Sequence, residues 1–162
     1  MRRPAALAVA LLWLATPAAA FPEGSFAAPE RDARVLVERT DDGGLRVELE
    51  APDFGAPLRA DLVPRADGTI FEEPLAPRGF LDRLVSRRAE RLPFEGRRLV
   101  WATRMEESLV VTTLEVDHGG HPDLRRAELS MTEAGELRLA LWRYAGMTAA
   151  PGPRLVLQRV ER

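Results

Sequence analysis

Both histidines of the chain lie in one short segment, Asp117–Asp123 (DHGGHPD). Imidazole nitrogens and carboxylate oxygens are common ligands of Zn²⁺ and Cu²⁺, so Asp117, His118, His121 and Asp123 are candidate metal ligands. The two glycines would let the segment fold back on itself. Gly and Pro are equally typical of a polar hairpin turn, and one exposed loop rarely supplies a rigid set of ligands. We therefore expect a turn here and keep metal binding as a third hypothesis.

Arginines inside strand-like apolar runs are candidates for binding an acidic ligand. Arg143 falls on the same face of an extended strand as the leucines of Leu137–Leu141, and Arg159 falls on the same face as those of Leu155–Leu157. If these faces line a barrel interior, each guanidinium would pair with an acidic group of the ligand. The commoner arrangement is an outward arginine whose charged group stays in water. Both interpretations remain open.

Aromatic residues are the second set of candidate binding residues. Trp101, Trp142 and Tyr144 would line an apolar pocket if they pointed into a cavity, but such residues more often fill a core. The run Leu137–Tyr144 carries leucines on one face and Ala140, Trp142 and Tyr144 on the other, so it is apolar on both sides. One of its faces is therefore expected to meet a helix or to form a contact for a partner.

Catalytic motifs are absent from the sequence. The chain has no cysteine and no Gly-x-Ser-x-Gly motif, and no histidine adjoins any of its serines in sequence. No glycine-rich phosphate loop precedes a helix. We therefore expect a protein that is not an enzyme and needs no cofactor.

The elements that would position these residues are mainly strands. Leu45–Ala51 alternates apolar and charged residues, which predicts a strand with one wet face, and it follows Arg34–Arg39 across an Asp-Asp-Gly-Gly turn. A weaker hairpin, Leu58–Val63 and Thr69–Glu73, comes next, and the spacing of apolar residues in Phe80–Leu92 predicts one helix. The remaining predicted strands are Arg98–Met105, Leu109–Val116, Leu124–Met131, Leu137–Tyr144 and Leu155–Val160. The pattern predicts an all-β antiparallel meander of about eight to ten strands that closes into a barrel with one short helix, with a β-sandwich as the alternative.

The first twenty residues are typical of a secretory signal peptide. Arg2 and Arg3 precede the apolar run Ala5–Thr16, and Ala18–Ala20 supplies small residues for cleavage after Ala20. We expect residues 21–162 to form a single domain in the periplasm of a bacterium or outside the cell, without stable membrane insertion. Loss of the two leader arginines changes the formal net charge from -2 to -4. This mildly acidic balance does not favour nucleic acid as a partner.

The order of these elements resembles the lipocalin-like, or calycin-type, family of small exported β-barrels. The likeness covers residues 21–162 and rests on the Gly24-Ser25-Phe26 lead-in, the meander and the arginine-bearing last strand. It implies an interior that binds one small apolar ligand, or an acidic one through an inward arginine. The alternative is a protein-interaction or envelope-structural module that uses the doubly apolar strand as its contact. Oligomeric state is left open by the sequence.

Overall fold

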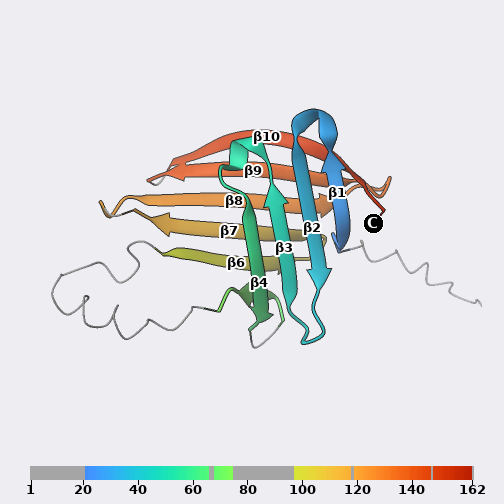
Figure 1. Cartoon of the computed structure of the whole chain (residues 1–162), viewed down its shortest axis with the longest axis horizontal. Helices are drawn as coiled ribbons and strands as arrows, with labels where there is room; N and C mark the ends of the chain where they lie inside the picture. Colours follow the sequence, from blue (N-terminus) through green and yellow to red (C-terminus); the bar gives the residue numbers. More distant parts are fainter. Residues whose placement is uncertain (1–20, 66–67, 75–96, 118, 147, 162) are drawn as a thin grey trace, which may run out of the picture.

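The computed structural model describes residues 21–65, 68–74, 97–117, 119–146 and 148–161 (Figure 1). These residues form ten antiparallel strands and two single-turn 3-10 helices, η1 (Pro29–Arg31) and η2 (Pro52–Phe54). Among them no helix has the length and apolar character needed to cross a bilayer. The strands are β1 (Gly24–Ala28), β2 (Ala33–Arg39), β3 (Leu45–Glu50), β4 (Leu58–Pro64), β5 (Ile70–Glu72), β6 (Arg98–Met105), β7 (Ser108–Val116), β8 (Pro122–Met131), β9 (Leu137–Ala145) and β10 (Thr148–Arg159).

The strands close into a barrel in which each strand pairs with its neighbour in sequence. The first and last strands complete the closure, because Phe26 of β1 pairs with Arg159 of β10. Figure 1 shows β1 to β4 running across the direction of β6 to β10, so the barrel is flattened and has two broad outer faces. The predicted all-β meander is therefore confirmed, and closure rules out the open β-sandwich.

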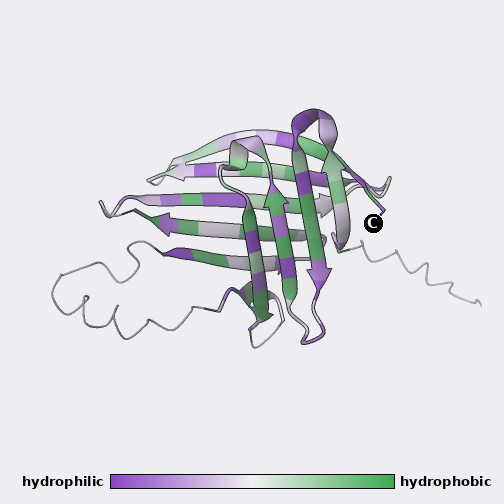
Figure 2. Cartoon of the chain, in the orientation of Figure 1, coloured by the Kyte–Doolittle hydropathy of each residue, from purple (hydrophilic) through white to green (hydrophobic). Residues whose placement is uncertain are grey.

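The core follows from the alternation of residue types along the strands. In β3, Leu45, Val47 and Leu49 are buried, whereas the charged residues between them lie outside. Figure 2 shows the same alternation of apolar and polar colour along β2 to β4. Inward leucines of β7, β8 and β9 meet this set from the other side and join it in one hydrophobic cluster. The hydrophobic core of the described residues thus lies between the two groups of strands.

The last hairpin is longer than predicted. The sequence pattern places no strand between Leu137–Tyr144 and Leu155–Val160, but β10 begins at Thr148 and pairs with β9 from Thr148↔Ala145 onward. Ladder hydrogen bonds come from the backbone, so the alanines of this stretch pair as well as bulkier residues. The register shifts between Pro151 and Arg154, which is where a sheet tolerates a proline. The predicted helix Phe80–Leu92 lies outside the described residues.

Candidate functional site

A cluster of charged side chains lies where β8 begins and β9 ends. The Asp123 carboxylate accepts hydrogen bonds from Arg143, with Nε–Oδ1 at 3.1 Å and Nη2–Oδ2 at 3.3 Å, and from Arg125, with Nε–Oδ2 at 3.1 Å. The sheet register produces this arrangement, because Arg125 and Arg143 are directly paired on neighbouring strands. Asp123, Arg125 and Arg143 lie on the same side of the sheet as the buried core residues, near the end of their strands. One carboxylate thus binds two guanidinium groups.

Two opposing effects act on the pKa of Asp123. Its partial burial alone would raise the pKa, but the hydrogen bonds and charges of Arg125 and Arg143 outweigh burial and hold the pKa below the usual value. The carboxylate is therefore ionised at neutral pH. Because its oxygens are already bound by two arginines, Asp123 is poorly placed to act as the predicted metal ligand.

Arg125 also connects the sheet to η2. Its Nη1 donates to the carbonyl oxygen of Phe54, 2.7 Å away, and Phe54 itself is buried. Arg125 was not among the residues singled out from the sequence. The sequence did contain a signal for Arg125. Arg125 is two residues before Ala127 and four before Leu129, both of which are buried, and therefore shares their inward face.

The histidine segment forms a tight turn between β7 and β8. Asp117 Oδ1 accepts hydrogen bonds from the backbone N–H groups of Gly119 and His121, both at 2.8 Å, and Asp117 Oδ2 lies 3.2 Å from His121 Nδ1. These interactions, led by the N–H of His121, lower the pKa of Asp117. His118 lies outside the described residues. Within the described ranges, no group of three or more histidine and carboxylate side chains is gathered as metal ligands.

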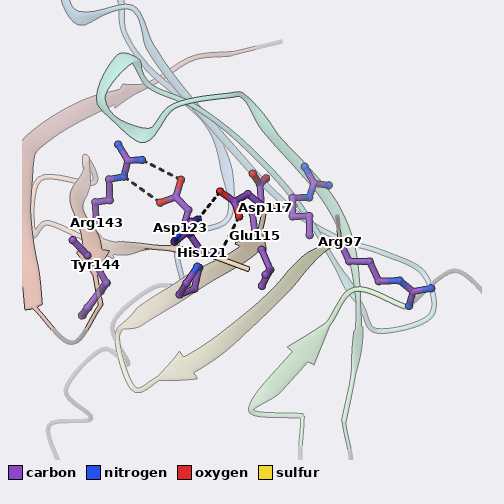
Figure 3. A pocket seen from close by; sticks show the side chains of 11 residues that line it. Arg97, Glu115, Asp117, His121, Asp123, Arg143 and Tyr144 are labelled. Carbon is purple, nitrogen blue, oxygen red and sulfur yellow. Dashed lines mark hydrogen bonds and ion pairs between the residues drawn. The ribbon is translucent and has the colours of Figure 1, made fainter. Parts of the chain in front are cut away.

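A surface cleft of about 840 Å³ joins this turn to the charged cluster (Figure 3). It brings Arg143 and Tyr144, predicted to bind a ligand, together with Asp117, His121 and Asp123, predicted to bind a metal. At its other side, Arg98 Nη2 donates to the carbonyl oxygen of Arg59 at 3.0 Å and pairs with Glu73 at 3.4 Å. The remaining lining residues are Arg97, Glu115, Val116, Pro122 and Ala145. Both signs of charge line the cleft, so it offers partners to both acidic and basic groups of a ligand.

Arg159 lies at the opposite end of the sheet from Arg143. Its Nη2 donates to the carbonyl oxygen of Glu23 at 2.9 Å, and its guanidinium carbon lies 5.3 Å from the ring centroid of Phe26. Arg159 thus lies on the same face of β10 as Leu155 and Leu157, as the sequence predicted. Its charged group, however, contacts β1 and the residues that precede β1.

Trp101, Trp142 and Tyr144 lie on the outer face of β6 to β9, not in the interior. Their neighbours in sequence, such as Val100, Ala102 and Leu141, point inward and are buried, whereas the three aromatic side chains remain partly exposed. Arg126 of β8 pairs with Trp142 of β9, and its guanidinium carbon lies 5.6 Å from the Trp142 ring centroid. The Arg126 Nε is buried and makes no hydrogen bond.

This outer surface forms three rows across the four strands, and we call it the aromatic face. Its rows are Leu99–Leu114–Leu124–Tyr144, Trp101–Thr112–Arg126–Trp142 and Thr103–Val110–Glu128–Ala140.

The other broad outer face of the barrel, on β2 to β4, has the opposite character. Charged residues predominate in its rows, as in Glu38–Arg46–Asp61, where Arg46 Nε donates to Asp61 Oδ1 at 2.8 Å. The next row, Leu36–Glu48–Arg59, also carries one buried apolar residue, Leu36. Such a face is well solvated. Val110 and Thr112 of the aromatic face are buried although they point outward. The two outer faces of one barrel therefore differ sharply in their affinity for water.

Comparison with protein-family models, with curated proteins and with solved structures finds no match. Among the described residues, the chemistry of the cleft and of the aromatic face points to a function.

Proposed function

We propose that this chain is an exported, non-enzymatic protein-interaction module that binds its partner through the aromatic face. The observation that carries the proposal is the contrast between the two outer faces of the barrel. The face on β2 to β4 carries mainly charged residues, whereas that on β6 to β9 centres on Trp101, Trp142 and Tyr144.

The composition of the aromatic face supports this assignment. Trp, Tyr and Arg are the residues that contribute most to binding energy at protein interfaces, because they bury a large area and retain a polar group for a specific contact. The aromatic face offers two tryptophans, one tyrosine and Arg126 within neighbouring rows. Partly exposed aromatic side chains gathered on one outer face of a folded domain are typical of a site that a partner covers.

Photo-crosslinking in the native compartment tests the proposal directly. A benzophenone amino acid replaces Leu124 on the aromatic face in one variant and Glu48 on the charged face in a matched control, since both residues point outward from an inner strand of their face. We expect a defined covalent adduct from position 124 and none above background from position 48. Adduct formation that is equal at the two positions, or absent at both, would contradict the proposal.

The cleft supports a second candidate function, binding of a small acidic ligand. Its volume of about 840 Å³ lies within the range of small-molecule sites, and Arg143 presents a largely exposed guanidinium there. Calorimetric titration with dicarboxylates tests this function, with Arg143→Gln as the variant and Arg46→Gln as the control. Heat of binding that survives in Arg143→Gln would place the ligand elsewhere.

A further inference from the structure

We infer that the partner of the aromatic face is a second copy of this chain, which stacks on it face to face about a twofold axis. The inference rests on the proposed function and narrows the partner that the function requires. Two properties of the face carry it, the distribution of side-chain size between its rows and the position of one pair of opposite charges.

Side-chain size alternates between the two adjacent rows at the centre of the face. On β6 and β9, Trp101 and Trp142 stand in one row, and the smaller Thr103 and Ala140 take the same places in the next row. A twofold axis can lie between the two stacked sheets and run parallel to the rows. When it passes midway between the two central rows, it exchanges one row with the other. Each tryptophan then stands over the small residue of the other copy. Large side chains opposite small ones are what two sheets packed about 10 Å apart require.

The charges obey the same operation. Arg126 and Glu128 are successive outward residues of β8, the middle strand of the β6–β10 group, and they occupy the two exchanged rows. The axis that places tryptophan over alanine also places each Arg126 opposite Glu128 of the other copy. A twofold interface is self-complementary in this sense, because every contact occurs twice.

The hydrogen bonding of Arg126 selects this register over its neighbour. Within one chain, the nearest approach of the Arg126 guanidinium to Glu128 is 3.9 Å, between Nη2 and Oε2, which is too long for a hydrogen bond. An axis shifted by one row would stack Leu124 on Arg126 and bury the guanidinium against a leucine, which is costly for a charged group. The register with crossed Arg126–Glu128 pairs instead supplies each guanidinium with a second carboxylate.

The test is a crossed charge reversal followed by analytical ultracentrifugation. We expect residues 21–162 to form a dimer, and Arg126→Glu or Glu128→Arg alone to weaken self-association about tenfold or more, because each variant places like charges opposite one another. An equimolar mixture of the two variants should dimerise again, because the glutamate introduced in one variant then meets the arginine introduced in the other. Rescue in the mixture requires contact between chains, since neither variant can repair its own face.

Controls and contrary outcomes separate this inference from the proposed function. Arg46→Glu and Glu48→Arg on the charged face should leave the dimer unchanged, and circular dichroism should show that all variants are folded. A wild-type chain that stays monomeric, or a mixture that stays monomeric, would overturn the inference. If the position-124 crosslinker then captured a different protein, the proposed function would stand with another partner. If the crosslinker instead captured residues 75–96 of its own chain, both the inference and the proposed function would be overturned.

Discussion

Arg125 Nη1 donates to the carbonyl oxygen of Phe54 at 2.7 Å, and this hydrogen bond joins strand β8 to the turn η2 across 71 residues of sequence. Gly55 follows Phe54 directly and has φ +94°, a backbone conformation that favours glycine. A Cβ atom at Gly55 would clash with Arg125 Nη1. The turn and the arginine are therefore fitted to each other.

Gly55→Ala should destabilise the fold by about 3 kcal/mol, because it combines backbone strain with displacement of the Arg125 guanidinium. Gly43→Ala is the matched control. Gly43 also has a positive φ, +81°, but no atom lies within 4 Å of the added Cβ. We expect the control to lose only about 1 kcal/mol. Urea unfolding of both variants measures the difference, and equal losses would show that the contact with Arg125 contributes nothing.

Asp123→Asn should lower the free energy of unfolding by about 1–3 kcal/mol at neutral pH, since a carboxylate that binds two guanidinium groups becomes a neutral amide. Asp61→Asn, which removes an exposed partner of Arg46, should cost about 0.5 kcal/mol or less. Thermal or urea unfolding at pH 7 measures both. A similar loss in the two variants would contradict the central role of Asp123.

The stabilisation by Asp123 should also depend on pH in a defined direction. The pKa of Asp123 in the folded chain lies below its usual value. Its ionised form therefore stabilises the folded state at pH values above the unfolded pKa, about 3.9 for Asp, and this contribution is lost as the pH falls through the folded pKa. The difference in stability between the wild type and Asp123→Asn should shrink in acid. A difference that stays constant between pH 7 and pH 3 would be inconsistent with this linkage.

The Phe21 ring contacts two guanidinium groups. The guanidinium carbons of Arg39 and Arg104 are 5.2 Å and 5.0 Å from its ring centroid. Phe21→Leu keeps an apolar side chain but removes the π face, so we expect a loss of about 1 kcal/mol in unfolding free energy, whereas Phe21→Tyr should retain wild-type stability. Urea unfolding of the two variants distinguishes them, and equal stability would mean that the cation–π contacts contribute nothing.

Phe21 is also the residue at which the exported chain is predicted to begin. Intact-mass measurement of the protein purified from the periplasm should give the mass of residues 21–162. Ala20→Arg, which removes the small residue expected before the cleavage point, should leave the leader attached. A full-length wild-type mass would contradict cleavage after Ala20.

The sequence by itself determined where the strands lie and which residues can share a face. Alternation is a local property of extended backbone, so Leu45–Ala51 and Arg98–Met105 were predicted as strands without knowledge of their neighbours. The shared face of Arg143 and the leucines of β9 was predicted for the same reason. The turn in Asp117–Asp123 was predicted from its Gly and Pro residues, and the structure closes it with a backbone hydrogen bond from Asp117 to His121. Closure into a barrel was also within reach, because short connections favour pairing of successive strands.

Only the tertiary structure decided which face of β9 points inward. One face of β9 carries Leu137, Leu139 and Leu141, and the other carries Ala140, Trp142 and Tyr144. Both sets are apolar, so periodicity shows that they lie on opposite faces but not which face is buried. Contact with the inward residues of β2 to β4 places the leucines in the core and leaves Trp142 and Tyr144 outside. The Arg125–Phe54 bond was hidden because it joins segments 71 residues apart. The Asp123 cluster was hidden because the register between β8 and β9, which the sequence does not fix, sets Arg125 beside Arg143. Such contacts depend on the three-dimensional arrangement of the strands, which local sequence patterns do not encode.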